Sequence, residues 1–173
     1  MKNDGENKYS VALKGSLGNG KYKHLADYSE KITLTPEKIT FAYVVTTTEP
    51  LKMKYYQPFH TLQYAPCSSL KGLGYKSIDK KGKEKLCQFP SAYEKENALR
   101  QYSLKSLRIV LPDGHAVLEA GENNTLSLSD TRSWGADNFR IDAIPYYSSA
   151  PKPIDHPAGS KFAWSYSISF EKK

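Results

Sequence analysis

Apolar and polar residues alternate along much of this chain, and a period of two predicts β-strands rather than helices. The clearest alternation is KFAWSYSISF, residues 161–170, in which every second residue from Phe162 to Phe170 is apolar. The residues between them are Ala or Ser, so one face of the predicted strand is apolar and the other is small and polar. We predict further strands, or pairs of strands, over residues 9–17, 31–48, 51–56, 59–64, 104–120, 125–129 and 138–144.

Turn-forming residues separate these predicted strands. The Pro-Asp-Gly sequence at 112–114 divides 104–120 into two strands, because proline presets one turn dihedral and glycine accepts a positive one. Short strands joined by turns, without regular helices between them, are typical of an antiparallel barrel or sandwich. We predict an up-and-down β-barrel, with a two-sheet β-sandwich as the alternative, since both folds produce the same alternation. A chain of 173 residues suits one core, so we expect a single domain over 9–173 after a disordered segment over 1–8.

One segment, SAYEKENALRQY at residues 91–102, carries a helix signature. Ser91 and Glu94 have the spacing of a capping box, in which each side chain bonds the backbone N–H of the other residue. Leu99 adds an apolar position that could pack against the β domain. We therefore predict a helix of about three turns over 91–102.

The only two cysteines, Cys67 and Cys87, enclose a lysine-rich loop. Structural zinc needs four ligands and a redox pair needs a C-x-x-C motif, and neither pattern occurs around these residues. Two free thiols are the alternative to a disulfide. We predict the disulfide, because closing a loop of this size contributes about 3 kcal/mol in the chain-entropy model. A structural disulfide implies an oxidising compartment, so we expect the mature chain of a periplasmic or secreted protein.

The chain is basic, with a net charge of +7 and a pI of about 9.2, which favours anionic partners. No zinc-finger or RNA-binding aromatic signature accompanies this charge, so nucleic acid is not the expected partner. Anionic envelope polymers or lipid headgroups fit an extracytoplasmic setting better. The residues predicted to contact such an anionic surface are Lys76, Lys80, Lys81, Lys83 and Lys85.

Motifs for catalysis are weak in this sequence. GSLGNGKY has the glycine and lysine spacing of a phosphate-binding loop, but Tyr22 stands where the motif needs Ser or Thr for magnesium. A G-x-S-x-G elbow is absent, and no triad can be assigned from residue order. The histidines are scattered rather than paired at ligand spacing. We therefore predict a protein that is not an enzyme and that uses no metal or cofactor.

The segment ITLTPEKITFAYVV, residues 32–45, followed by the strand-like LKMKYY at 51–56, resembles the early hairpin of small bacterial lipocalin-like (calycin) proteins. The resemblance covers residues 8–64 by pattern. It implies an up-and-down barrel of about eight strands with a helix packed nearby. It also implies a small apolar ligand held in the barrel mouth.

A carrier of this kind should bind its ligand with aromatic residues, because small-molecule sites are mainly apolar and Tyr and Trp add a polar group. We predict a secreted or periplasmic carrier of a small apolar or amphipathic ligand. The alternative is an interaction module, an adhesin- or inhibitor-like β-sandwich that binds a protein or glycan through its loops. In a sandwich the same aromatic residues would form an ordinary core. The residues predicted to line the ligand site are Phe41, Tyr43, Trp134, Phe139, Trp164 and Tyr166.

Overall fold

The computed structural model is almost entirely β. The residues that it describes are 2–5, 7–18, 24–53, 61–144 and 154–172. The strands are β1 (Lys2–Gly5), β2 (Lys8–Leu17), β3 (Ala26–Leu34), β4 (Lys38–Thr47), β5 (Leu51–Met53), β6 (Thr61–Pro66), β7 (Gly74–Asp79), β8 (Glu84–Gln88), β9 (Arg100–Leu111), β10 (Gly114–Ala120), β11 (Thr125–Asp130), β12 (Asn138–Ile144), β13 (Ile154–His156) and β14 (Lys161–Lys172).

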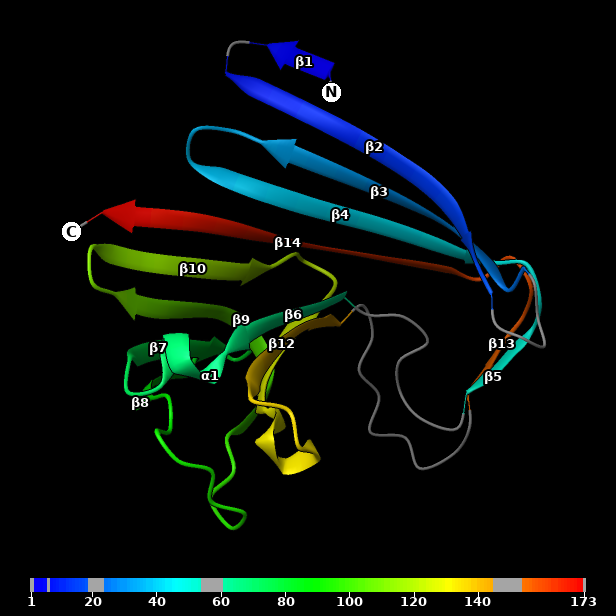
Figure 1. Cartoon of the computed structure of the whole chain (residues 1–173). Coiled ribbons are helices and arrows are strands. Elements are labelled where there is room, and N and C mark those ends of the chain that lie inside the picture. The colour runs from blue at the N-terminus through cyan, green and yellow to red at the C-terminus, as the bar shows by residue number, and fades with distance from the viewer. Residues whose placement is uncertain (1, 6, 19–23, 54–60, 145–153, 173) are drawn as a thin grey trace.

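Twelve of these strands form one twisted antiparallel sheet (Figure 1). Their order is β1-β2-β3-β4-β14-β10-β9-β11-β12-β6, with β7 paired to β9 and β8 paired to β7. β5 and β13 form a separate two-stranded ribbon. The predicted all-β antiparallel class is confirmed. Two of the predicted strands extend over 54–56 and 59–60, which lie outside the described residues.

The sheet does not close into the predicted barrel. β1 and β6 stand at the two ends of the strand order and do not pair with each other in the described part of the chain. Barrel closure requires such end strands to pair, so the two-sheet sandwich alternative fits better. The cause is the last strand: β14 inserts between β4 and β10 in the middle of the sheet instead of closing its edge.

β9 is the strand on which the sheet divides. Along one edge, residues 106–111 pair with β10 and residues 100–104 pair with β11. The other edge pairs with β7. On one side of this division β10 pairs with β14, and β14 pairs with β4. We call the strands β1 to β4 the arm. On the other side β11 pairs with β12, and β12 pairs with β6. We call β11 with β12 the inner branch. The arm and the inner branch separate between Ala120 and Thr125 (Figure 1).

The main core lies around β9 and the inner branch. Leu107, Leu128 and Phe139 are completely buried there, because strands β9, β11 and β12 turn their apolar alternate residues to the same side. The short helix α1 (Cys67–Leu70) buries Cys67 and Leu70 in this core. Phe89, which follows β8, packs against the same core, with its ring centroid 4.9 Å from that of Phe139. Burial of these apolar side chains is the main stabilising contribution.

The predicted disulfide is wrong, because Cys67 and Cys87 are both free thiols. Cys67 is buried at the start of α1, whereas Cys87 lies half-buried on β8. The segment between them does not depend on a covalent clasp. β7 and β8 pair as a hairpin from Gly74 to Ile78, and β7 also pairs with β9, so backbone hydrogen bonds hold the segment in the sheet. The compartment prediction therefore loses the cysteine argument on which it rested.

The predicted helix over 91–102 is also wrong. Residues 91–99 form bends and a turn without regular structure, and β9 begins at Arg100. Arg132 explains in part why this segment is not helical, because its guanidinium donates to the carbonyl oxygens of Pro90 and Ser91 at 3.0 and 3.2 Å. An isolated helix of about three turns is marginal in water without tertiary packing, and here tertiary contacts favour the extended chain.

Lys2–Gly5, in the segment for which disorder is predicted, forms β1 along β2. Among the described residues, the helices are too short and too polar to cross a membrane.

Candidate ligand-binding pocket

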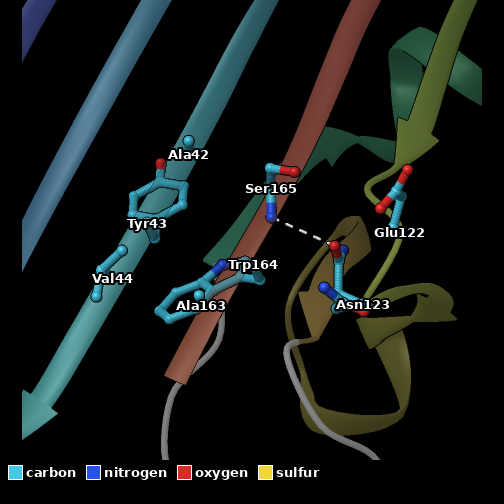
Figure 2. A pocket seen from close by; sticks show the side chains of 9 residues that line it. Ala42, Tyr43, Val44, Glu122, Asn123, Ala163, Trp164 and Ser165 are labelled. Carbon is cyan, nitrogen blue, oxygen red and sulfur yellow. Dashed lines mark hydrogen bonds between the residues drawn. The ribbon is translucent and has the colours of Figure 1, made fainter. Parts of the chain in front are cut away.

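A surface pocket of about 370 Å³ lies beside β14, next to the turn that leads from β10 to the inner branch (Figure 2). One wall is the turn that follows β10, and the rest comes from neighbouring positions of β4 and β14. The lining residues are Ala42, Tyr43, Val44, Glu122, Asn123, Asn124, Ala163, Trp164 and Ser165.

Backbone contacts to Ser165 fix the turn that forms this wall. The Gly121 N–H donates to the Ser165 carbonyl oxygen at 2.8 Å, and the Ser165 N–H donates to Asn124 Oδ1 at 3.3 Å (Figure 2, dashed line). Gly121 permits this approach, because a Cβ there would collide with Ser165 Oγ and lie 3.1 Å from the Ser165 carbonyl oxygen. Both backbone polar groups of Ser165 are therefore bonded to the turn, which holds the wall against β14.

The wall carries three polar side chains in succession. Glu122 and Asn123 are exposed, and Glu122 has neither a hydrogen bond nor an ion pair within the described chain. Asn124 is buried, and its Nδ2 donor has no partner among the described groups although its Oδ1 is bonded. A carboxylate accepts hydrogen bonds, and an amide both donates and accepts them. This wall is therefore suited to a ligand that carries several hydroxyl groups.

The floor of the pocket is made of small side chains. Ala42 and Val44 on β4 lie beside Ala163 and Ser165 on β14, since Val44 pairs with Ala163 and Ala42 with Ser165. Successive side chains point to opposite faces of a strand. The rings of the intervening Tyr43 and Trp164 therefore belong to the other face of the sheet, and a ligand in the pocket would meet these residues mainly through their backbone.

On that other face, four of the six aromatic residues predicted from sequence form a stacked ladder. Phe41 stacks on Tyr166 with centroids 4.8 Å apart, and Tyr43 stacks on Trp164 at 5.1 Å. Tyr43 Oη also donates to Glu30 Oε1 at 2.6 Å. Burial and this hydrogen bond raise the pKa of Tyr43 well above its ordinary value, so the phenol stays protonated at neutral pH.

The other two predicted aromatic residues lie elsewhere. Phe139 is completely buried in the core beside Phe89, whereas Trp134 is 59% exposed at the end of η1 (Thr131–Trp134). The Arg140 guanidinium lies over the Trp134 ring, 4.8 Å from its centroid. The six residues therefore do not form one site, and a ligand role for any of them stays a prediction.

A second polar cluster is buried on the inner branch. Asp142 Oδ2 accepts a hydrogen bond from Ser127 Oγ at 3.0 Å and forms an ion pair with the Arg140 guanidinium at 3.1 Å. Asp142 is only 3% exposed, yet within the described chain its Oδ1 has no hydrogen-bond partner, and neither does Arg140 Nε or Ser129 Oγ. Unsatisfied buried polar groups usually mark an ordered water, a bound group or a functional site. This cluster begins at Ser127 on β11, three residues after Asn124 of the pocket wall.

The five lysines of the predicted anionic-surface contact lie on the β7–β8 hairpin. Lys76 pairs with Glu84 at 2.6 Å. The other four, Lys80, Lys81, Lys83 and Lys85, are exposed, and none of the five lines the pocket. Their contact with an anionic surface stays a prediction. No group of three or more His, Cys, Asp or Glu side chains within the described ranges is placed to hold a metal ion.

Comparisons with known proteins identify the fold. No family model matches the chain, and no curated protein matches it in sequence. Among solved structures, a protein from Synechocystis sp. PCC 6803 matches with a TM-score of 0.57 at 11% identity, over 100% of this chain and 65% of that one. A proposed aldose 1-epimerase from Escherichia coli K12 matches with a TM-score of 0.53 at 16% identity, over 95% of this chain and 66% of that one. The chain thus shares their fold and spans just under two thirds of their length.

These likenesses correct three predictions. The resemblance to lipocalin-like proteins is wrong, because the fold is that of the aldose 1-epimerase-like structure and the sheet is open. The carrier function built on that resemblance is wrong for the same reason. The prediction that the protein is not an enzyme is also wrong, since the fold is shared with a proposed sugar epimerase. The glycan-binding alternative agrees better with these findings.

The polar residues of the pocket wall are not among the site residues predicted from the sequence. Glu122, Asn123 and Asn124 follow a predicted strand, and the short N-x-T pattern of Asn123-Asn124-Thr125 indicates a glycosylation acceptor rather than a binding site. The available signal was Gly121, because a glycine directly after a strand marks a close approach of another backbone. That signal does not say which strand approaches, and the contact with Ser165 joins positions 44 residues apart.

Proposed function

We propose that the pocket beside Ser165 binds an aldose, either free or at the end of a glycan. The observation that carries the proposal is the pocket wall of Glu122, Asn123 and Asn124, held on β14, which offers the exposed amide of Asn123 and a Glu122 carboxylate that has no partner among the described residues. Sugar hydroxyl groups both donate and accept hydrogen bonds. The wall matches them on both counts.

The size and shape of the pocket agree with this ligand class. A volume of about 370 Å³ falls at the small end of the range for small-molecule sites. The floor of Ala42, Val44 and Ala163 is apolar and flat enough to contact the C–H groups of a sugar ring. Preorganisation by the Gly121 and Asn124 contacts lowers the entropy cost of binding, because the wall need not be ordered by the ligand.

The fold adds support for sugar chemistry, since one of the proteins that share it is a proposed aldose 1-epimerase. Epimerisation at C1 requires a base that takes the O1 proton while the C1–O5 bond breaks, which leaves an aldehyde at C1 and a hydroxyl at O5 after O5 takes a proton from solvent water. The sugar then closes on the opposite face in the reverse sequence. Glu122 is the carboxylate of the described pocket lining, so we assign to it the proton transfer at O1. Catalysis at this site is the second candidate function.

Binding is tested by calorimetric titration of the protein with glucose, galactose and mannose. Glu122→Gln should weaken binding of the preferred sugar about tenfold or more, because a hydrogen bond to a charged group is lost. The matched control is Glu119→Gln, which removes the same charge from an exposed position of β10 outside the pocket. Absence of binding by all three sugars, or equal weakening by both variants, would contradict the proposal.

Catalysis is tested separately by polarimetry of freshly dissolved α-glucose and α-galactose. The wild-type protein should accelerate the approach to anomeric equilibrium above the buffer rate, and Glu122→Gln should abolish the acceleration. A sugar that binds without any acceleration would leave binding as the function and exclude the epimerase candidate.

A further inference from the structure

The arm presents an apolar sheet face to solvent. Tyr9 lies opposite Leu34, which lies opposite Ile39, and the next row contains Val11, Ile32 and Phe41. These rows continue onto β14, where Phe170 points to the same face. Exposure is large for such side chains: 44% for Leu13, 43% for Leu34 and 68% for Phe170.

The opposite face of the same strands is polar, as expected for a surface that remains in water. On β3 it carries Ser29, Lys31 and Thr33, which alternate with the apolar residues. An antiparallel sheet with one polar and one apolar face normally packs the apolar face against another layer. The neighbouring part of this face is covered: the ring of Tyr28 lies over Gly15, and His156 of the β5–β13 ribbon packs edge-on against Phe162. The rows from Tyr9 to Phe41 lack such a cover among the described residues.

The charges on this face and on the whole chain limit which surface can pack against these rows. The carboxylate on this face of the arm is Glu30, and Tyr43 Oη already donates to it at 2.6 Å. The whole chain carries a net charge of +7, so most faces of two copies repel each other. This face is an exception, because two copies meeting here would oppose apolar side chains, and the Glu30 carboxylate of each copy accepts a hydrogen bond from its own Tyr43.

We propose that two copies of this chain pack through the apolar face of the arm as an isologous dimer. Two twisted sheets pack face to face at about 10 Å with their strands inclined by about 30°, and a two-fold axis between identical faces satisfies this geometry. Each copy supplies the layer that the other copy lacks. The proposal is independent of sugar binding, because the pocket opens on the opposite face of β4 and β14.

The test is the molar mass of the purified protein by sedimentation equilibrium over a concentration series. The wild type should approach twice the chain mass of 19.5 kDa. Leu13→Lys should remain a single chain at concentrations where the wild type is dimeric. Ala12→Lys is the matched control, since it adds the same charge at the next residue of β2 on the polar face and should leave the dimer intact.

Salt and a second pair of variants complete the test. The dimer should persist or strengthen as sodium chloride is raised, because salt screens the repulsion between two basic chains and does not weaken apolar contact. If circular dichroism shows that Leu13→Lys is unfolded, Leu34→Lys with Thr33→Lys as its control takes its place on β3. A wild type that stays a single chain throughout, or a control that dissociates like its partner variant, would overturn the proposal.

Discussion

The arm and the inner branch have the same alternating sequence pattern and opposite environments. In β2 and β3 of the arm, apolar residues such as Leu13 and Leu34 are over two fifths exposed. In β11 of the inner branch, TLSLSD, every residue from Thr125 to Asp130 is buried, the serines included. Alternation therefore defines the two faces of a strand, whereas the neighbours of the strand decide how many faces are covered.

This difference in burial determines whether a polar side chain can form its hydrogen bonds with water. Ser16 on the polar side of the arm is exposed, so water satisfies its hydroxyl group at little cost. Ser127 and Ser129 of the inner branch must find partners inside the protein, and among the described residues Ser127 donates to Asp142 whereas Ser129 Oγ has no partner. A buried hydroxyl without a partner destabilises by about 1–3 kcal/mol, so the inner branch combines the strongest apolar burial with unsatisfied polar groups.

Truncation of one leucine in each region gives the largest expected contrast. Leu128→Ala should lower the free energy of unfolding by about 4 kcal/mol, because Leu128 is completely buried and its removal leaves a cavity. Leu13→Ala should lower it by less than about 1 kcal/mol per chain, since much of that side chain is already in water. Urea denaturation at low protein concentration, where the arm faces solvent, measures both values. Equal losses would contradict the contrast.

Removal of the buried carboxylate should have a smaller effect. Asp142→Ala leaves the Arg140 guanidinium and Ser127 Oγ without their partner, and we expect a loss of about 2–3 kcal/mol of unfolding free energy. The loss stays below that of a fully buried ion pair because the Arg140 side chain is partly exposed. Combining Asp142→Ala with Arg140→Leu should recover part of it in thermal or urea unfolding. A double variant less stable than the sum of the single losses would contradict this view of the cluster.

The smallest expected effect concerns pH. Burial raises the pKa of the Cys67 thiol to about 11 from an ordinary value of 9.0. Below pH 9 the thiol is neutral in both states and its contribution to stability is complete. As pH rises from about 9 to about 11, the unfolded thiol ionises first and this contribution is lost, on the order of 1 kcal/mol at pH 10.

Comparison with Cys67→Ala isolates that contribution, because the buried tyrosines Tyr43 and Tyr75, whose pKa values are also raised, remain in both proteins. The wild type should lose more stability than the variant between pH 8 and pH 10 in urea unfolding. Iodoacetamide should also modify the half-buried Cys87 before Cys67. Parallel pH profiles for the two proteins would show that Cys67 is not responsible.

The sequence predicts strand β14 well, because the first half of this strand alternates between buried and exposed residues as its sequence does. It fails for the β7–β8 hairpin, because β8 reverses the expected pattern: Leu86 is exposed while Cys87 points inward. The sequence also gives the wrong answer on whether the sheet closes into a barrel, since the position of β14 between β4 and β10 depends on pairings between residues far apart in sequence. Period-two alternation contains no information about such partners.

The candidate pocket could not be predicted for a related reason. The aromatic residues chosen from sequence are conspicuous because they form a ladder, and stacking in the sheet already explains Phe41, Tyr43, Trp164 and Tyr166. The polar wall depends instead on the contact between Gly121 and Ser165, which only the branching of the sheet creates. Small polar residues in a turn acquire a role from their position, and a single sequence does not show that position.

The central claim is that an aldose binds in the pocket between β14 and the turn that leads from β10 to the inner branch. Titration of ¹⁵N-labelled protein with galactose or glucose, followed by amide chemical shifts, tests it most directly. The account predicts saturable shifts for Gly121, Asn123 and Ser165, and unchanged amides for Ser77 and Lys85 on the β7–β8 hairpin. Shifts confined to other parts of the molecule, or no saturable shifts with either sugar, would contradict it.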